Sequence, residues 1–338
     1  MSKNTRADID IQVANELVRR ALMSCGANGD IAQSVAASCI DAQREGSDGG
    51  GLGGAIDYCN ALRAGRVQGS LPHRSERPAL ALFAVDAAEG FTHPAFDAEF
   101  EALCDTTREV GVAVFGLRNG YASGSLGYYV RRLAERGLVA LAATNAGPAL
   151  VAASGSKEPV FCTNPIALGV PRDNTYPLVI DQSSSQTAMA NLRIAADNGH
   201  DIPDNWALDS NGQPTTDPAA ALNGVLLAFG GARGANVALL VEMLAAGATA
   251  ANWSLEAPSY IEGEQSPGTG LLVIAIHATL LAGPQMARRI DDYLNQLRER
   301  YGAYIPGERR AANRDRQTDS LSVNTAMLNA LRNLAGAD

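Results

Sequence analysis

Short apolar runs follow one another between residues 112 and 184, and a single helical pattern, SLGYYVRRLAERG, interrupts them. The runs VAVFGL, LVALAATN, IALGVP and PLVIDQS are partly β-branched and are bounded by Gly, Pro or Asn, as strands are. Another apolar run, GLLVIAIHATLLAG at 270–283, is predicted to be a buried strand. With its 34 glycines and an aromatic fraction of only 5%, the sequence indicates a closely packed α/β chain of the enzyme type.

Helical patterns dominate the beginning of the chain. Residues 11–45 carry two of them, ANELVRRALMSCG and DIAQSVAASCIDAQREG, and Asp30 stands where the N-cap of the second helix belongs. AIDYCNALRAG is predicted to be a third helix that ends at Gly65. Next, PALALFAVDAA (78–88) is predicted as a strand, and PAFDAEFEALCDTTREVG as a helix closed by Gly111.

The second half contains polar connections as well as regular elements. Residues 198–218 are predicted to be a loop with a turn at Asn211-Gly212. Two helices, NVALLVEMLAAG and PQMARRIDDYLNQLRER, flank the strand at 270–283. A polar segment at 307–320 precedes a last amphipathic helix, NTAMLNALRNLAG.

Residues 46–54 read GSDGGGLGG, and Gly49, Gly51 and Gly54 have the spacing G-x-G-x-x-G. A dinucleotide-binding loop needs a strand before its first glycine and the start of a helix at its last. Here the preceding segment is helical, and no acidic residue ends a second strand about twenty positions later. The spacing is therefore interpreted as accidental, and this stretch is not a Rossmann loop.

Composition excludes several functional classes. The net charge of −9 argues against nucleic acid or an anionic membrane as a partner. The five cysteines form no C-x-x-C pair and are expected to be reduced, buried thiols of a cytoplasmic protein. The four histidines have no metal-ligand spacing, so no metal site is predicted. The polar start MSKNTRADIDIQ does not resemble a signal peptide, and the longest apolar run is too short to span a bilayer, which predicts a soluble chain.

Longer motifs identify a relationship. LRNGYASGSLGYYVRRLAERGLVALAATNAGP, EPVFCTNPIALGVPR, PLVIDQSSSQTA, WALDSNGQPTTDPAAAL and GGARGANVALLVEMLAAG occur in this order. Together they resemble the malate/L-lactate dehydrogenase family that is unrelated to the Rossmann lactate dehydrogenases. That family includes sulfolactate, ureidoglycolate and 2,3-diketogulonate enzymes and the piperideine-2-carboxylate and pyrroline-2-carboxylate ketimine reductases. The resemblance covers nearly the whole chain, including LRAGRV and YIPGERR.

The resemblance implies a homodimer with a non-Rossmann α/β fold and a site for NADH or NADPH between domains. It divides the chain into a helical N-terminal part (1–75), a main α/β domain (76–120 and 260–338) and a mixed-sheet, nicotinamide-binding domain (121–259). The expected partner is a small-molecule substrate.

Several stretches resemble the family's cofactor site. DQSSSQT matches its D-x-A-x-S stretch, and Gly230-Gly231 with Arg233 and Gly234 match its G-G-x-K-G turn with Arg in place of Lys. Taken singly, each could be an ordinary turn or a solvated strand end. The residues that the resemblance assigns to the cofactor are Asn145, Thr163, Asn164, Pro165, Asp181, Ser183, Ser184, Ser185, Thr187, Arg233, Gly234, Gly307, Glu308 and Arg309.

The family's catalytic side chains do not appear at the matching positions. Family members carry D-S-H-G followed by an Arg, whereas here Asp48 is followed by Gly49 and Gly50, and the Arg position is Gly54, or Gly53 in a shifted register. A second family histidine, in N-S-x-H-x-G, aligns with Ala122. The G-K pair that follows the D-x-A-x-S stretch in the family is replaced here by Ala190-Asn191, so its lysine is missing.

These replacements leave three hypotheses about function. Ketone reduction leaves an alkoxide that needs a proton donor, whereas a protonated imine already carries its proton. The first hypothesis is an NAD(P)H-dependent oxidoreductase that reduces a C=N or C=O group of a small molecule, with Asp48, Tyr121 and Ser123 as candidate catalytic residues. Tyr121 could equally be a packed aromatic side chain whose hydroxyl bonds to backbone. The second is a redox-neutral enzyme for cyclisation, elimination or condensation, and the third is a non-catalytic pseudoenzyme. The loss of both histidines and of the arginine disfavours ordinary 2-hydroxy-acid dehydrogenation.

Overall fold

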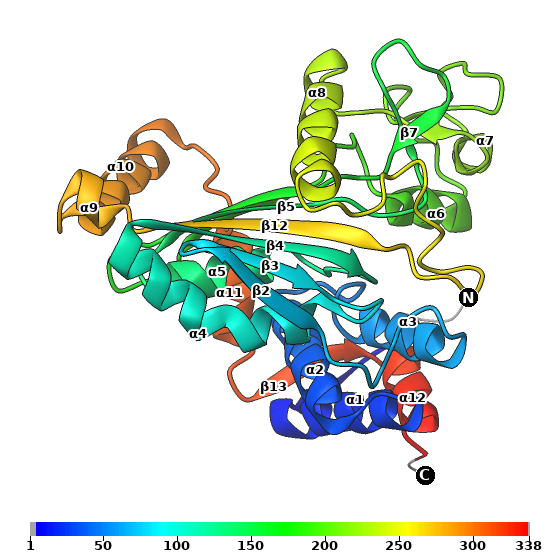
Figure 1. Ribbon diagram of the computed structural model, residues 1–338. Helices are drawn as coiled ribbons and strands as arrows, with labels where there is room; N and C mark the ends of the chain where they lie inside the picture. Colours follow the sequence, from blue (N-terminus) through cyan, green and yellow to red (C-terminus); the bar gives the residue numbers. More distant parts are fainter. Residues whose placement is uncertain (1–4, 337–338) are drawn as a thin grey trace.

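A computed structural model describes residues 5–336 and divides them into a helical layer, a large sheet and a smaller sheet (Figure 1). The helical layer is formed by both ends of the chain. The first and last parts of the chain pair in a two-stranded antiparallel sheet, with Arg6 opposite Asn324. The elements of this layer are β1 (Arg6–Asp10), α1 (Ile11–Ser24), α2 (Gly29–Arg44), α3 (Leu52–Arg63), β13 (Ser320–Asn324) and α12 (Thr325–Leu334).

The large sheet has seven strands in the order β2-β3-β4-β12-β5-β8-β9. Only β3 and β4 pair in parallel; the other neighbours are antiparallel. Its strands are β2 (Arg74–Ala79), β3 (Leu82–Asp86), β4 (Val112–Gly120), β5 (Val139–Thr144), β8 (Ile166–Val170), β9 (Leu178–Gln182) and β12 (Thr269–Ile276). Helices α4 (Thr92–Val110) and α5 (Gly127–Glu135) cover one face, where a core around Phe96, Phe115 and Tyr129 is buried (Figure 1).

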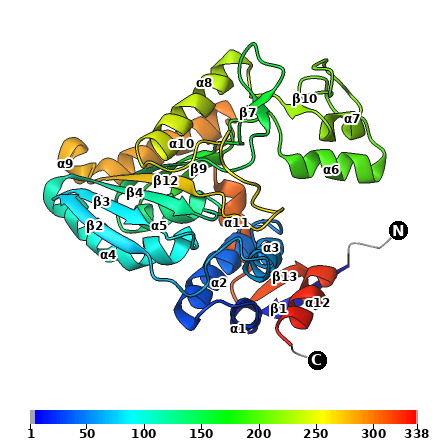
Figure 2. The same ribbon diagram turned by 45° about the vertical axis from the view of Figure 1, so that its right-hand side comes forward.

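The smaller unit lies on the opposite side of the large sheet from the helical layer (Figure 2). Its four-stranded sheet has the order β10-β11-β6-β7. The unit contains β6 (Val151–Ala152), β7 (Pro159–Phe161), α6 (Met189–Asn198), β10 (Ala207–Leu208), α7 (Pro218–Leu222), β11 (Val225–Leu226) and α8 (Ala232–Val241). The seven-stranded sheet contains β5, β8 and β9 as well as β2, β3 and β4, so it crosses the domain boundary predicted at residue 120.

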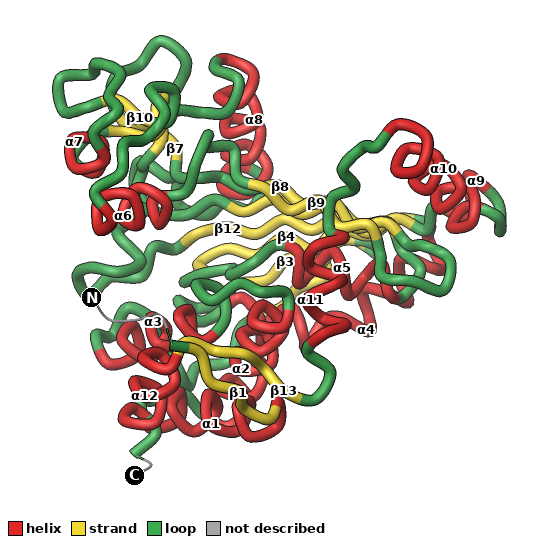
Figure 3. Tube along the Cα trace, turned by 180° about the vertical axis from the view of Figure 1, so that it is seen from behind, coloured by secondary structure: helices red, strands yellow, loops and turns green. Residues whose placement is uncertain are grey.

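The segment after β12 returns to the helical layer along the back of the sheet (Figure 3). It contains α9 (Thr279–Ala282), α10 (Met286–Tyr301) and α11 (Glu308–Arg316). In Figure 3, α11 lies between the sheet and the β1–β13 pair. This position places α11 where its side chains can join the helical layer to the sheet.

Most predicted elements are present, and the differences have local causes. The strand predicted at 78–88 is one arm of a hairpin, because β2 and β3 pair antiparallel with Ala79 opposite Leu82. The N-cap of α2 is Asn28, whose side chain accepts from Ile31 N at 2.9 Å, so the prediction of Asp30 was wrong by two residues. Gly111 closes α4 with φ of 97°, as predicted.

Other differences concern the second half of the chain. The run at 270–283 is a strand only to Ile276, and the short helix α9 follows. The helix predicted from NVALLVEMLAAG has two parts: α8, which ends at Val241, and a π-helical turn, Glu242–Gly247, which follows it directly. The polar segment at 307–320 contains α11, and α6 was not predicted. No helix within residues 5–336 is long and apolar enough to cross a membrane.

Candidate active site

The glycine run at residues 46–54 follows α2 and leads into α3, as expected for a stretch that is not a dinucleotide-binding loop. Residues 46–51 form turns after α2, and Gly51 is the N-cap residue of α3. The element directly before the run is the helix α2 and not a strand, so the prediction that it is not a Rossmann loop is confirmed. Gly50 lines a small cavity of about 10 Å³ between the helical layer and the sheet. The other residues around this cavity include Glu45, Tyr58, His93, Gly124 and Tyr128.

Asp48 is held by two neighbours. Arg6 Nη1 lies 2.8 Å from Asp48 Oδ2, and Gln43 Nε2 donates to Asp48 Oδ1 at 2.7 Å. Partial burial raises the pKa of Asp48, but the hydrogen bonds from Arg6 and Gln43 outweigh this and lower it overall. The carboxylate therefore stays ionised and fixes the glycine run against β1.

Tyr121 and Ser123 lie just beyond the end of β4. The Tyr121 hydroxyl donates to the carbonyl of Tyr260 at 2.6 Å, and burial raises its pKa to about 12. Ser123 Oγ lies 3.0 Å from Thr144 Oγ1, which donates to the Gly270 carbonyl at 2.6 Å. These contacts place Tyr121 beside the loop before β12 and Ser123 beside the end of β5, and none of them reaches Asp48.

His93 is a buried histidine near the two replaced positions, and no sequence motif pointed to it. It is 1% exposed, its ring stacks on Tyr129, and Nδ1 has no hydrogen-bond partner within residues 5–336. Burial lowers its pKa to about 4. A Cβ at Gly124 would lie 3.0 Å from its Nε2, so only glycine leaves room for this ring.

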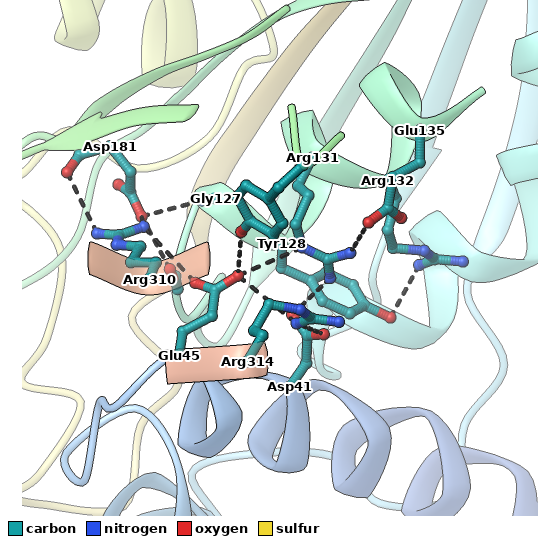
Figure 4. A network of polar contacts seen from close by, with 12 residues as sticks. Asp41, Glu45, Gly127, Tyr128, Arg131, Arg132, Glu135, Asp181, Arg310 and Arg314 are labelled. Atoms are coloured by element: carbon teal, nitrogen blue, oxygen red, sulfur yellow. Dashed lines mark hydrogen bonds and ion pairs between the residues drawn. The ribbon is translucent and has the colours of Figure 1, made fainter. Parts of the chain in front are cut away.

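A network of buried charges joins the helical layer to the sheet (Figure 4). Arg131 of α5, whose side chain is 4% exposed, contacts Asp41 and Glu135 at 2.6 Å each and lies 3.3 Å from Glu45. Burial opposes the charge of Arg131, but the carboxylates of Asp41 and Glu135 raise its pKa overall. The network is therefore anchored by a permanent cation next to the glycine run.

Glu45 lies at the centre of this network, directly before the glycine run. The Tyr176 hydroxyl donates to Glu45 Oε1 at 2.8 Å, and Arg310 Nη1 lies 3.8 Å from Oε2. Burial, with a smaller contribution from Asp41, raises the pKa of Glu45. Arg314 adds a contact to Asp41 at 2.5 Å, so α2, α5 and α11 share one set of ion pairs (Figure 4).

Asp181 at the end of β9 connects the network to the stretch that resembles the cofactor site. Its Oδ2 accepts from Ser125 Oγ at 2.8 Å, from Gly127 N at 3.0 Å and from Arg310 Nη1 at 2.9 Å. One oxygen atom of Asp181 therefore contacts both the backbone at the start of α5 and an arginine side chain of α11.

The serines after Asp181 run between two other predicted segments. Ser184 N donates to the Thr163 carbonyl at 2.8 Å, and Phe229 N donates to the Ser184 carbonyl at 3.0 Å. Ser185 Oγ lies 2.9 Å from Ser183 Oγ and donates to the Thr187 carbonyl at 2.7 Å. The structure therefore brings 163–165, 181–187 and 228–231 together.

Asn145 and Asn164 are buried, and both side-chain amides form hydrogen bonds within the protein. Asn145 donates to the Asn252 carbonyl at 2.8 Å and accepts from Gly270 N at 2.9 Å. Asn164, next to Pro165 and with φ of 37°, donates to Glu242 Oε1 at 2.7 Å. These side chains hold the loops around the predicted cofactor site.

The GGARG turn borders a hollow of about 340 Å³ in the smaller unit. Gly230 and Gly231 have φ of 57° and 66°, and a Cβ added at either would meet nothing within 4 Å. Gly234 is packed instead, since a Cβ there would lie 2.1 Å from the Phe229 carbonyl. Arg233 is exposed in the first turn of α8. An open glycine turn at the N-terminus of a ten-residue helix, beside an arginine, fits the phosphates of a dinucleotide.

The GER match lies beside β9, just before Asp181, since a Cβ added at Gly307 would lie 3.0 Å from the Val179 carbonyl. Gly307 caps α11 with φ of 87°, Glu308 pairs with Arg298 at 3.2 Å, and Arg309 is exposed. The neighbouring Arg310 is the residue that reaches Asp181. The spacing of Arg310 and Arg314 by four residues on α11 was the available signal for their shared face.

All five cysteines are free and buried, which confirms that prediction. Within residues 5–336, no group of three or more His, Cys, Asp or Glu side chains could hold a metal ion.

Comparison with known proteins gives concordant results. The sequence pattern of the malate/L-lactate dehydrogenase family matches residues 9–332. A delta(1)-pyrroline-2-carboxylate/delta(1)-piperideine-2-carboxylate reductase of Pseudomonas syringae pv. tomato is 36% identical over 324 residues, which are 95% of this chain and 94% of that protein. A (2R)-3-sulfolactate dehydrogenase (NADP(+)) of Chromohalobacter salexigens is 36% identical over 325 residues, 96% of this chain and 97% of the relative.

Solved structures agree with these relationships. The crystal structure of the Pseudomonas syringae delta1-piperideine-2-carboxylate reductase superposes with a TM-score of 0.91 at 35% identity, covering 97% of this chain and 99% of the other. The sulfolactate dehydrogenase of Methanocaldococcus jannaschii has a TM-score of 0.90 at 27% identity, with 98% of each chain covered.

Proposed function

The chain belongs to the malate/L-lactate dehydrogenase family and is an oxidoreductase, and on this premise we propose that it uses NADH or NADPH to reduce a C=N or C=O group of a small molecule. A small molecule with a C=N group is the favoured substrate. Two relatives that are 36% and 33% identical are named as reductases of cyclic imines that carry a carboxylate.

We favour an imine as the substrate because of the side chains that could donate a proton in this site. Gly50 and Ala122 have no side chain that can donate a proton, and the Asp48 carboxylate is kept ionised by Arg6 and Gln43. The buried His93 has a pKa of about 4 and is therefore neutral at pH 7. Reduction of a ketone without a positioned acid forfeits roughly 10²–10⁴-fold in rate. A protonated imine avoids this loss because it already carries the proton.

The residues of this chain fit a nicotinamide coenzyme, which would supply the hydride. Gly230 and Gly231 leave open space at the start of α8, where backbone N–H groups and the charge of Arg233 suit a phosphate. Ser183, Ser185 and Thr187 provide small hydroxyl groups along the adjoining stretch. Asn145 and Asn164 keep the surrounding loops in place through the hydrogen bonds of their side-chain amides.

The remaining predicted residues would act at the substrate end. We propose that Tyr121 and Ser123 provide hydrogen bonds to the substrate, since both lie beside Ala122, one of the replaced histidine positions. Asp48 acts by fixing the glycine run through Arg6. Arg310 acts through Asp181, which binds the start of α5.

We further propose that two copies of the chain form a dimer. The sheet face opposite α4 and α5 has a hollow of about 440 Å³ along β2, β3, β4 and β12. Nearby segments expose large apolar side chains: Leu239 is 47% exposed, Leu240 46% and Met243 49%. Exposed apolar side chains grouped in this way are typical of an interface between subunits.

Calorimetric titration of the purified protein with NADH and with NADPH tests the coenzyme assignment. Micromolar binding of either is expected, and the tighter one identifies the coenzyme. Oxidation of that coenzyme at 340 nm is then followed with a cyclic imine carboxylate and with pyruvate as a matched 2-oxo acid. Faster turnover of the imine is expected; failure of both coenzymes to bind at millimolar concentration contradicts the proposal.

A further inference from the structure

His93 and Tyr58 each bury a polar atom that has no hydrogen-bond partner in the part of the chain that the structure describes. His93 is 1% exposed, and its Nδ1 is unpartnered. Tyr58 is 8% exposed and packs its ring edge-on against Phe91 and Tyr121, whereas its hydroxyl forms no hydrogen bond with any residue of 5–336. Buried polar atoms of proteins are nearly always paired, either within the chain or with an ordered water.

Both side chains line the cavity of about 10 Å³ that Gly50 borders, and their ring centroids lie 6.4 Å apart. A space of this size admits one water molecule and nothing larger. Ser38 and Ser125 also line the cavity, so its wall is polar, as a hydrated cavity requires.

The charged groups that line the cavity are already paired within the chain. Asp41 contacts Arg131 and Arg314, and Glu45 contacts the same two arginines. Among the described residues, no group of three or more His, Cys, Asp or Glu side chains could hold a metal ion. A neutral occupant is therefore favoured over a cation.

A hydrogen bond to the backbone of Ser123 determines which nitrogen of His93 carries the proton. Burial lowers the pKa of His93, and the bond to Ser123 opposes this, so the ring is the donor in that bond. Because Nδ1 has no partner, the donor is Nε2, which leaves the lone pair of Nδ1 as an acceptor. A water in the cavity can donate to this lone pair and accept from the Tyr58 hydroxyl.

Glycines border the cavity on both sides. A Cβ at Gly124, where φ is 61°, would lie 3.0 Å from His93 Nε2 and 3.3 Å from the Tyr58 hydroxyl. Gly50 borders the cavity from the glycine run. The cavity therefore lies where the glycine run meets the segment 121–125, and these are the two places where the family's histidines are replaced, by Gly50 and Ala122.

We propose that one water molecule is bound in this cavity, where it accepts from the Tyr58 hydroxyl and donates to His93 Nδ1, and that this chain of hydrogen bonds holds residues 121–125 in position for the substrate. His93 reaches that segment through Ser123, and Tyr58 reaches it through the ring of Tyr121. Tyr58 and His93 are thus positioning residues. Their positioning role rests on the proposed function, whereas the water site does not.

A high-resolution crystal structure and NMR of protein labelled with 15N-histidine test the water site without any substrate. The crystal structure should show one ordered water within about 3.2 Å of both His93 Nδ1 and the Tyr58 hydroxyl. The NMR spectrum should show His93 protonated at Nε2, with an Nδ1 resonance typical of a hydrogen-bond acceptor. A dry cavity, a cation in it or a proton on Nδ1 overturns the proposal.

Tyr58→Phe removes the donor to the water and keeps the ring. The Nδ1 resonance of His93 should shift, and kcat for a cyclic imine carboxylate should fall about 3- to 10-fold, with KM for the coenzyme within about twofold of wild type. Tyr128→Phe is the matched control, since Tyr128 also lines the cavity but its hydroxyl donates to Asp97 at 3.2 Å. The His93 resonance should stay as in wild type in this control, and an equal shift in both variants overturns the role of the Tyr58 hydroxyl.

His93→Gln, alone and combined with Tyr58→Phe, tests the positioning role, because Gln can still donate to Ser123 but lacks the Nδ1 acceptor. Both substitutions interrupt the same chain of hydrogen bonds, so the double variant should lose about as much kcat as the larger single loss. Losses that multiply contradict the shared role. If His93→Gln does not fold, the His93 resonance in Tyr58→Phe decides. A wild type that binds neither NADH nor NADPH contradicts the proposed function, whereas the water and the protonation of His93 are still measured in that protein.

Discussion

Arg310 Nη1 lies 2.9 Å from Asp181 Oδ2, and this ion pair ties α11 to the end of β9. The same oxygen accepts from Ser125 Oγ and from Gly127 N at the start of α5. A single carboxylate therefore fixes three elements that are far apart in the sequence. The stretch from Ser183 to Thr187 continues directly from this fixed point.

Replacing Arg310 by Met is expected to lower the free energy of unfolding by about 1–3 kcal/mol, because Asp181 keeps its charge but loses its cation. Urea unfolding followed by circular dichroism measures the change. Arg309→Met is the control; Arg309 is exposed and should change stability by less than about 0.5 kcal/mol. Equal effects of the two variants would falsify the role of the ion pair.

Elements defined by short-range patterns were predictable from sequence. The helix closed by Gly111 and the strands at 112–120 and 139–144 follow from apolar spacing and from the terminating glycine. The hairpin of β2 and β3 was predicted as one strand at 78–88, because its turn at Leu80-Ala81 carries no glycine or asparagine signal.

Long-range electrostatics could not be predicted in the same way. Asp41, Arg131, Asp181 and Arg310 come from four distant segments, and no local pattern relates them. That the buried Arg66 Nε has no hydrogen-bond partner within residues 5–336 is likewise visible only when its neighbours are known. The motif match at Arg309 came within one residue of the side chain that contacts Asp181.

Arg233→Ala is expected to weaken coenzyme binding by about 1–3 kcal/mol, because a charged hydrogen bond to a phosphate is lost. Calorimetric titration with the preferred coenzyme measures the difference, and Arg233→Lys should retain much of the affinity. Arg288→Ala, an exposed arginine on α10, is the control. Unchanged binding in Arg233→Ala excludes this residue from the site.

His93 makes stability dependent on pH. Burial lowers its pKa from 6.5 to about 4, so the unfolded chain binds more protons than the native chain between these values. Stability should therefore fall as pH decreases from about 6.5 to about 4, with His93 contributing about 3 kcal/mol. In His93→Phe this part of the pH dependence should disappear, whereas in His200→Phe, on an exposed loop, it should persist. Thermal unfolding across this pH range provides the comparison.

The proposed dimer predicts a change in mass for a single substitution. Leu240→Asp places a charge in the exposed apolar surface of α8 and should shift the protein from two chains to one in light scattering. Val13→Asp, at a position 58% exposed on α1, should leave the mass unchanged. A monomeric wild type refutes the dimer.

Restoring histidines at the replaced positions tests why the chain favours an imine. In the double variant Gly50→His/Ala122→His, an imidazole can donate the proton that a 2-oxo acid needs on reduction. The structure leaves room at residue 50, where a Cβ would lie 3.0 Å from the hydroxyl of Ser47, a side chain that can rotate away. Reduction of pyruvate should therefore rise by at least about 10-fold, with imine reduction changed much less. Gly50→Gln/Ala122→Gln fills similar volume without an acid and should show no gain. If both double variants behave alike, the missing imidazoles do not set the substrate preference, and the proton for imine reduction must be sought from another group near Tyr121.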